Sequence, residues 1–359
     1  LQASQSYSLT GDVRVNAGGR IGVVSGYGTN YSYTNRCDLI VLGDLTIESN
    51  GSIDATGAGW KNYSDALPAG WGWTVNVTCG AHGGVSKTHS SAIPYVYDSI
   101  LNPMLPGEGA QNGDAATAQF GGGCVKLTVS GKLTLNGAAH AKSVYQDGNG
   151  GAGGTINITC ASIEGSGGIN VTTQSGYGGT QGGGGRVAIR LTGDGADFAD
   201  YPLSRITVTQ NGDQSSGGTI YLQTAAEAEN AGTVYIKGDV GNTAAALTPF
   251  PSLVGGGEND NFSAAKLQIV NNGKAILSAD AKVGEFGMGN TGALDFNGKV
   301  LKVHKAILTQ SGGTAMPKLE PGTYTAAKLN ELTGTTIYTD SVGGGSLIVK
   351  GTGMMLLVR

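Results

Sequence analysis

The chain has 359 residues, of which 64 are Gly, against a Gly share of about 7% in average proteins. Only 13% of the residues are charged and the formal net charge is −4, without the basic stripe that marks nucleic-acid binding. The hydrophobic share of 39% excludes a disordered chain of low hydrophobicity, and no apolar run reaches the ~18 residues of a membrane span.

The N-terminal segment begins without Met or a signal peptide, which indicates a processed, secreted chain. Its first run, SYSLTGDVRV, carries apolar residues at alternate positions, namely Tyr7, Leu9, Val13 and Val15. A period of two is typical of a strand with one buried face. A similar copy, CDLIVLGDLTIESNGSIDATG, begins at Cys37.

Residues 58–123 interrupt this pattern and are interpreted as a long excursion from a rigid scaffold, where binding residues often lie. Its aromatic side chains form the candidate glycan-binding set, which is Trp60, Trp71, Trp73, Tyr95 and Tyr97. Cys79 and His82 form a C-x-x-H pair, but zinc sites need four ligands and the sequence shows no second pair. A structural role for Cys79 is therefore favoured over zinc binding.

A repeat follows, with copies that begin at Cys124, Thr155, Arg186 and Thr219, 31 to 33 residues apart. Equivalent positions are apolar in each copy, so Val125, Ile156 and Val187 are predicted to form one buried ladder of stacked strands. No helical period separates the strands, although parallel strands usually need a helical crossover. The sequence therefore predicts an all-β fold, a parallel and right-handed β-helix with Gly-rich loops over residues 1–240.

The stretch GYGGTQGGGGRVAIR, residues 176–190, is one of these loops. A phosphate-binding loop does not fit, because a strand follows where a helix N-terminus is required. Disorder is disfavoured because the Gly runs recur at a fixed period between strands. The remaining interpretation is a repeated corner, in which Gly lets the backbones of neighbouring copies approach closely.

The outward positions of the repeat contain no column of carboxylates of the kind that a β-helix lyase or hydrolase needs. Lys126, Arg186 and Arg190 could hold an anionic sugar, but solvated surface charges are the favoured interpretation. In the loop GDGADFADY, the carboxylates Asp194, Asp197 and Asp200 could bind Ca²⁺. Ordinary turn chemistry of Asp is the favoured alternative, so no cofactor is expected beyond that possible Ca²⁺.

From about residue 241 to 359 the Gly-rich loops disappear and the copies shorten, which indicates a separate C-terminal β region or cap. Residues 324–332, YTAAKLNEL, form the best helix candidate, with Thr325 as its N-cap. The chain ends in the strand-like runs GSLIVKG and MMLLVR, the second of which includes Leu356 and Val358.

These segments resemble Gly-rich secreted bacterial β-helix proteins, through GAHGGVS, GGGCVKLTVSGKLTLNG and GGGGRVAIR. The C-terminal half is similar to autotransporter-passenger and adhesin-type β-helices, through GALDFNGKVLKV and PGTYTAAKLNELTG. The resemblance covers most of the chain and implies an extracellular or cell-surface location. It supplies no catalytic residue.

The four Cys residues, Cys37, Cys79, Cys124 and Cys160, are expected to form disulfides in an oxidising compartment, with the pairing left open. Cys160 aligns with the inward Val129, whereas Cys124 is expected to face outward.

The sequence as a whole favours a structural protein, a fibre subunit or adhesin without enzymatic activity, that self-associates head to tail into an oligomer or filament. Its joining strands would carry Tyr7, Leu9, Val13 and Val15 at one end and Leu356 and Val358 at the other. The alternative is a carbohydrate-active β-helix enzyme or a glycan-binding module with a cell-surface polysaccharide as its partner.

Overall fold

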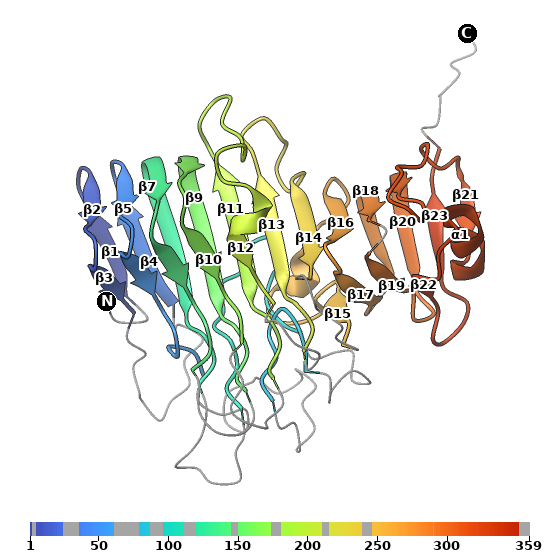
Figure 1. Cartoon of the computed structure of the whole chain (residues 1–359), viewed down its shortest axis with the longest axis horizontal. Coiled ribbons are helices and arrows are strands. Elements are labelled where there is room, and N and C mark those ends of the chain that lie inside the picture. Colours follow the sequence, from blue (N-terminus) through green and yellow to red (C-terminus); the bar gives the residue numbers. More distant parts are fainter. Residues whose placement is uncertain are drawn as a thin grey trace.

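The computed structural model describes residues 1, 5–23, 36–60, 79–86, 96–110, 120–144, 150–173, 181–209, 215–238, 246–289 and 291–351. Within these ranges the chain is mostly β, with mainly parallel sheets and one short α-helix. The strands follow one another along the long axis of an elongated molecule, from the N-terminal residues at one end to α1 at the other (Figure 1).

One long sheet runs through the whole molecule, and its first part is parallel throughout. The strands of this part are β1 (Ser6–Leu9), β4 (Arg36–Val41), β7 (Cys124–Leu135), β9 (Thr155–Glu164), β11 (Arg186–Leu191) and β13 (Thr219–Gln223), with β2 (Val13–Val15) and β5 (Leu45–Ile47) beside β7.

The predicted ladder of Val125, Ile156 and Val187 is confirmed. Val125 pairs in register with Ile156, which pairs with Val187, and each side chain is at most 1% exposed. The register extends to Cys37 on one side and to Ile220 on the other, so one apolar column spans five consecutive strands.

The long sheet changes direction at its centre. Strand β14 (Thr233–Lys237) is antiparallel to β13, and the following strands are parallel to β14. They are β16 (Lys266–Val270), β18 (Ala281–Met288), β20 (Val300–Leu308) and β23 (Ser346–Val349), and β21 (Gly322–Tyr324) closes the end in antiparallel orientation.

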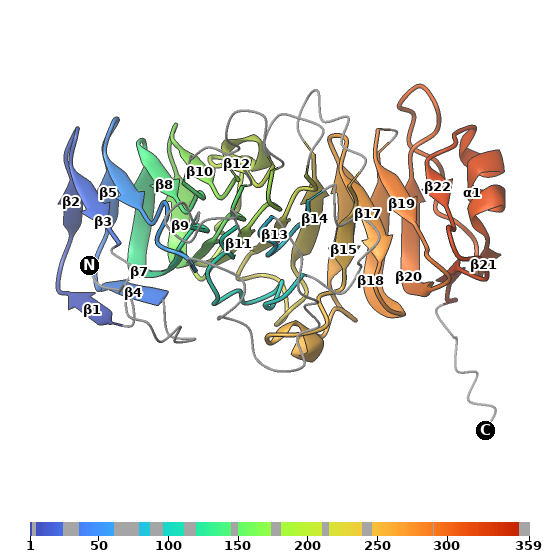
Figure 2. The ribbon, with the colours of Figure 1, turned by 90° about the horizontal axis from the view of Figure 1, so that it is seen from below.

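Two smaller parallel sheets cover the two parts (Figure 2). The first contains β3 (Arg20–Gly22), β6 (Ser52–Asp54), β8 (Ala138–His140), β10 (Gly168–Asn170) and β12 (Ile206–Thr207). The second contains β15 (Thr248–Phe250), β17 (Lys274–Leu277), β19 (Ala293–Asp295) and β22 (Tyr338–Thr339). Two short 3₁₀ turns, Leu203–Arg205 and Gly257–Asn259, lie in the connections.

The apolar core moves from one face of the long sheet to the other at the β13–β14 hairpin. The first core is the cluster of buried apolar side chains in the first part of the molecule, and the second core is the corresponding cluster in the second part. Ile220 and Leu222 belong to the first core, whereas Tyr221 between them belongs to the second. Tyr221 pairs with Val234, which is also in the second core, so the side chains of β14 continue the face that was outward in the first part. The predicted boundary near residue 240 stays a prediction.

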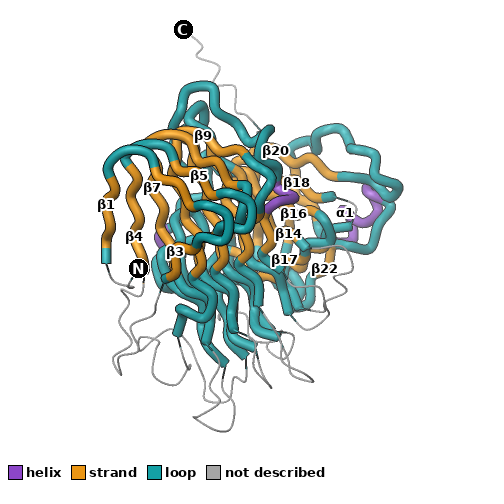
Figure 3. Tube along the Cα trace, turned by 60° about the vertical axis from the view of Figure 1, so that its left-hand side comes forward, coloured by secondary structure: helices purple, strands orange, loops and turns teal. Residues whose placement is uncertain are grey.

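The Gly-rich runs form a layer at one edge of the first part, visible as the stacked loops at the bottom of Figure 3. We call residues 121–123, 152–154, 183–185 and 216–218 the Gly layer. Consecutive amides in it have separate acceptors: Gly121, Gly122 and Gly123 donate to the carbonyls of Trp60, Ala152 and Ala55. Residues 183–185 repeat this arrangement toward Gly80, Ser216 and Val171.

Such a pattern is that of an extended helix with three residues per turn, as in polyproline II, which has no hydrogen bonds of its own. In the Gly layer the amides of each run donate to carbonyls of neighbouring segments, and this close packing explains the Gly content of these runs. A Cβ on Gly153 would stand 1.8 Å from the Val171 carbonyl oxygen, and one on Gly218 would stand 1.7 Å from that of Gly185.

Helix α1 (Ala326–Thr333) lies at the C-terminal end, close to the predicted position. Thr325 is its N-cap, as predicted, and its side chain accepts a hydrogen bond from the Lys328 amide. Gly334, with φ of 66°, ends the helix in the left-handed conformation that Gly adopts readily. Leu329 is fully buried in the second core, so α1 covers the end of the strand stack.

Candidate functional site

A segment of the excursion, residues 96–106, crosses the outward face of β9 and β11, and we call it the strap. Thr155 Oγ1 donates to the Leu105 carbonyl at 2.7 Å, and Asn157 Nδ2 donates to the Pro103 carbonyl at 3.0 Å. Arg186 donates two hydrogen bonds to the Tyr97 carbonyl, at 3.0 and 2.8 Å. Outward side chains of the repeat therefore bind the backbone of the strap.

The strap covers the face on which β-helix enzymes would place their catalytic groups. On this face, outward side chains at equivalent positions of successive strands form columns that follow the predicted register. The first two columns are largely buried rather than solvated. In the first column Cys124, Thr155 and Arg186 are each 0% exposed. The interpretation of Arg186 as a solvated surface charge is therefore wrong. Arg190 is also partly buried and donates to the Leu101 carbonyl, while Lys126 is partly exposed.

Two Asp residues fix the shape of the strap. Asp98 has a φ of 74°, which is uncommon for a residue with a side chain. Its carboxylate accepts hydrogen bonds from the amides of Met104 and Leu105, both at 2.9 Å. Asp260, from the loop before β16, accepts from the Ile100 amide at 2.7 Å. The strap is therefore joined to both parts of the long sheet.

Beneath the strap lies a cluster of buried polar side chains. His82 Nδ1 lies 2.9 Å from the Gly153 carbonyl, and its Nε2 lies 3.4 Å from Asp98 Oδ2. Because a carbonyl only accepts, Nδ1 carries the proton in the neutral ring, and the contact with Asp98 needs one further proton. Burial is the largest influence on the His82 pKa and lowers it, while Asp98 acts in the opposite direction.

Glu108 is the second ionisable group of this cluster. Its Oε2 accepts from the Ala81 amide at 3.0 Å, whereas its Oε1 has no hydrogen-bond partner among the residues that the structure describes. Burial raises the pKa of the Glu108 carboxyl well above its ordinary value, because an apolar surrounding favours the neutral form over the charged one. The Trp60 indole N–H is likewise buried, with no partner in the described part of the chain.

The Glu108 carboxyl gives a prediction about pH. A folded-state pKa above the unfolded value means that the folded state holds the proton more tightly, so stability falls as pH rises from the unfolded pKa toward the folded one. We expect Glu108→Gln, which keeps an acceptor for Ala81, to be more stable than the wild type at pH 8. The difference in free energy of unfolding between the variant and the wild type should grow by up to about 1.4 kcal/mol per pH unit between the unfolded and folded pKa values of Glu108. It should vanish at low pH.

Denaturant unfolding of both proteins between pH 4 and 8 checks this. Glu164→Gln is the control: the hydrogen bond from Lys132 lowers the pKa of the partly exposed Glu164, so this variant should not gain stability over the wild type as pH rises. If the free energy of unfolding depends on pH in the same way for the wild type and Glu108→Gln, the raised pKa of Glu108 is wrong.

The aromatic residues proposed as a glycan surface do not form one where the structure describes them. Trp60 and Tyr97 stack with ring centroids 5.4 Å apart, but each side chain is only 1% exposed. They pack inside the excursion and stabilise it, so their assignment to glycan binding is wrong. Trp71, Trp73 and Tyr95 lie outside the described residues.

The predicted calcium loop contains exposed carboxylates, Asp194, Asp197 and Asp200, after β11. Asp197 Oδ1 accepts from the Ala199 amide at 2.9 Å, which is the turn chemistry that the sequence favoured. The described parts of the chain contain no group of three or more His, Cys, Asp or Glu side chains placed to hold a metal ion. The calcium alternative is therefore not supported, and the Cys79–His82 pair gains no further ligands there.

All four Cys residues are buried and none of them forms a disulfide, so the expected disulfides are absent. Cys37 and Cys160 lie in the first core, where they replace apolar residues of the ladders. Cys124 does point away from that core, but it is 0% exposed. Burial raises the pKa of Cys124, and it raises that of Cys160 to about 12, so both thiols are unreactive in the folded protein.

The predicted assembly residues at the N-terminal end lie on edge strands. Tyr7 and Val13 pack partly buried against the first core, Val15 is buried, and Leu9 is 39% exposed. Leu356 and Val358 lie outside the described residues.

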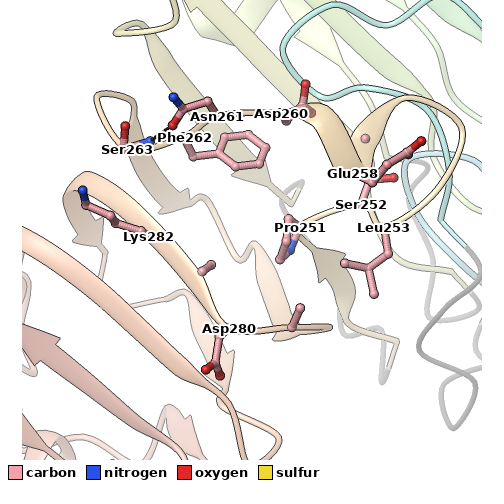
Figure 4. Close-up of a pocket in the computed structure, with 13 residues that line it drawn as sticks. Pro251, Ser252, Leu253, Glu258, Asp260, Asn261, Phe262, Ser263, Asp280 and Lys282 are labelled. Atoms are coloured by element: carbon pink, nitrogen blue, oxygen red, sulfur yellow. Dashed lines mark hydrogen bonds between the residues drawn. The ribbon is translucent and has the colours of Figure 1, made fainter.

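A groove is present on the second part of the molecule, and we call it the Phe262 groove (Figure 4). It has a volume of about 350 Å³ and lies between residues 251–263 and the turn at 279–282. Figure 4 shows Lys282 and Ser263 on one side and Leu253 and Glu258 on the other, with Phe262 and Pro251 between them. Sequence reasoning missed this groove, although the loop GGGENDNFS is dense in polar residues.

Comparison with known proteins finds no matching family model, no similar curated protein and no similar solved structure. The described part of the chain contains no helix with the length and apolar character of a membrane span.

Proposed function

We propose that this chain is a right-handed parallel β-helix that acts as an extracellular structural or surface protein through self-association. The observation that carries the proposal is the difference between the two ends of the strand stack. The extracellular location rests on the resemblance to secreted bacterial β-helix proteins.

The β-helix is supported by the return of the chain to the same sheet at a constant spacing. Cys124, Thr155, Arg186 and Thr219 stand side by side in four consecutive strands of the long sheet. Between them the chain passes through the smaller sheet, where Ala139, Ile169 and Ile206 form a second in-register column. Each of the repeats that begin at Cys124, Thr155 and Arg186 thus adds one strand to each sheet, as successive coils of a solenoid do.

The C-terminal end of the stack is covered. Helix α1 packs beside β22 and buries Leu329, and the antiparallel strand β21 closes the long sheet. A helix over the end of a sheet protects its strand edges from pairing. The head-to-tail joint that the sequence suggested would have to displace this cap.

The N-terminal end offers an edge for pairing. Among the described strands, β1 has a partner on one side only, which is β4. The Gln5 carbonyl accepts from the Asp38 amide in β4 at 3.1 Å, and the Leu9 carbonyl accepts from the amide of Leu42, directly after β4, at 2.9 Å. Since alternate residues of a strand direct their backbone groups to opposite sides, those of Ser6 and Ser8 point away from β4.

Apolar surface accompanies this edge. Leu1, Tyr7, Val13 and Ile21 pack against the first core and remain partly exposed. A second copy that meets this end through a twofold axis would cover these side chains and pair β1 with its own equivalent. Such an isologous contact closes as a dimer of two stacks joined at their N-terminal ends.

The alternative, a carbohydrate-active enzyme that uses the outward face of the repeat, receives less support. The strap occupies that face, and the buried Arg186 binds the strap through a backbone carbonyl and binds Thr219 Oγ1 at 2.7 Å.

Light scattering during size-exclusion chromatography tests the proposal. We expect a dimer that dissociates in Ser8→Pro, because Pro removes the outward N–H of the edge strand. Ser8→Ala is the matched control and should remain a dimer with an unchanged melting temperature. A chain that stays monomeric at its highest soluble concentration, or a Ser8→Pro variant that remains dimeric, would contradict it.

A further inference from the structure

We propose that the Phe262 groove is a binding site for one ring of a neutral saccharide. Its volume of about 350 Å³ lies at the lower end of the roughly 300–1,000 Å³ of small-molecule sites. This inference does not depend on the self-association proposed above, since the groove lies on the second part of the molecule, away from β1.

The centre of the groove is apolar and fixed. Phe262 packs on Phe250 with ring centroids 5.0 Å apart and is 6% exposed, so its ring is held in place and contributes a small apolar wall. Pro251, Ala279 and Ala281 also line the groove. A pyranose ring has apolar C–H faces that such a wall can contact, while its hydroxyl groups remain free for polar partners.

Three polar side chains of the rim are each held by one backbone hydrogen bond. Asn261 Oδ1 accepts from the Ser263 amide at 3.1 Å, and Glu258 Oε2 accepts from the Gly256 amide at 2.8 Å. Asp280 Oδ1 accepts from the Val300 amide at 2.9 Å. Each side chain is thus oriented, and its other polar atom has no partner within the described residues. All three side chains are exposed, so these atoms are open to solvent and can be reached by a ligand.

The rim provides both donors and acceptors. The donors are Asn261 Nδ2, Ser263 Oγ and Lys282 Nζ, and Lys282 forms no ion pair within the described chain. The acceptors are the free carboxylate oxygens of Glu258 and Asp280. Vicinal hydroxyl groups both donate and accept, so they match this mixture better than a cation, which cannot use the donors.

The charges of the groove also argue against an anionic ligand. Glu258, Asp260 and Asp280 line it together with the single cation Lys282. Burial raises the pKa of Asp260, but its carboxylate is already bound by the Ser99 hydroxyl at 2.5 Å and by the Ile100 amide. The remaining groups place two carboxylates against one ammonium group, which disfavours uronic acids and sulfated sugars.

Ligand-observed NMR and titration calorimetry test the site on the full chain. The probes are the methyl glycosides of glucose, galactose, mannose and N-acetylglucosamine, with glucosamine and glucuronate as charged controls. We expect at least one neutral glycoside to bind with millimolar affinity. Lys282→Ala and Asp280→Asn should each weaken its binding by about tenfold, since each removes a hydrogen bond to a charged group.

Lys302→Ala is the matched control, because Lys302 is the register partner of Lys282 on the next strand and does not line the groove. Its affinity for the neutral glycoside should equal that of the wild type. Three results would overturn the proposal: no neutral glycoside binds at tens of millimolar, only glucosamine or glucuronate binds, or Lys302→Ala weakens binding as much as Lys282→Ala. None of these results bears on dimer formation, which is measured separately.

Discussion

Replacing Ile156 with Asp is expected to unfold the first part of the molecule. Ile156 stands at the centre of the ladder between Val125 and Val187, is 1% exposed and belongs to the first core. A carboxylate at this position would be surrounded by apolar side chains and would have no charged partner. The expected loss is more than about 4 kcal/mol, in the range reserved for buried charges and lost networks.

Denaturant unfolding followed by circular dichroism measures this loss. Ile156→Val should cost only about 1 kcal/mol, because it removes one methylene from the same site. Thr159→Asp places the same carboxylate three residues along β9 on the outward face, where Thr159 is partly exposed beside Arg190, and should change stability by less than about 1 kcal/mol. A normal transition for Ile156→Asp would show that the ladder does not carry the fold.

Replacing Gly153 with Ala is expected to destabilise the protein by roughly 3 kcal/mol or more, although Gly→Ala often stabilises a chain. The added Cβ would stand 1.8 Å from the Val171 carbonyl oxygen and 2.7 Å from the Gly185 amide nitrogen. Both are backbone atoms of neighbouring segments, so no rotation of a side chain can relieve the contact. The same Gly153 amide donates to Gly183, and a shift of the backbone would break that hydrogen bond.

Gly168→Ala in strand β10 is the matched control. Its nearest neighbour to an added Cβ is the Arg205 carbonyl oxygen at 3.4 Å, an ordinary contact, so its melting temperature should be equal to or above that of the wild type. Equal melting temperatures for both variants would mean that the Gly layer is loosely packed.

The periodic parts of the fold could be predicted from the sequence because the alternation along each strand alone decides which side chains point into the core and which point outward. Alternation placed Val125, Ile156 and Val187 on one face, and the same 31-residue spacing gave the correct columns of outward residues. Helix α1 was predictable because Thr325 and Gly334 mark its two ends chemically.

The non-periodic parts could not be predicted, because they depend on contacts between distant segments. Nothing near Thr155 or Arg186 in the sequence indicates that residues 96–106 will cover them. The reversal at residues 224–232 lacks the Asn-Gly or Asp-Gly signal of a short hairpin, so β14 could not be distinguished from a further parallel strand. The Phe262 groove joins two segments, one ending at Ser263 and the other beginning at Ala279, and neither segment is distinctive alone.

The move of the core across the long sheet has a mechanical consequence. At β13–β14 the strands reverse direction, and the core moves to the opposite face of the long sheet. Either change alone would reverse the handedness of the winding. Because both occur together, the proposed β-helix keeps the same handedness from end to end. Strand β11 is covered on both faces there, with Val187 and Ile189 in the first core and Ala188 in the second. A force applied to either part of the molecule is therefore transmitted through these hydrogen-bonded strands. Their side chains belong to both cores, so neither part can unfold there without disturbing the other. We expect the two parts to bend together as one rigid body, without a hinge at β13–β14, where the core changes face.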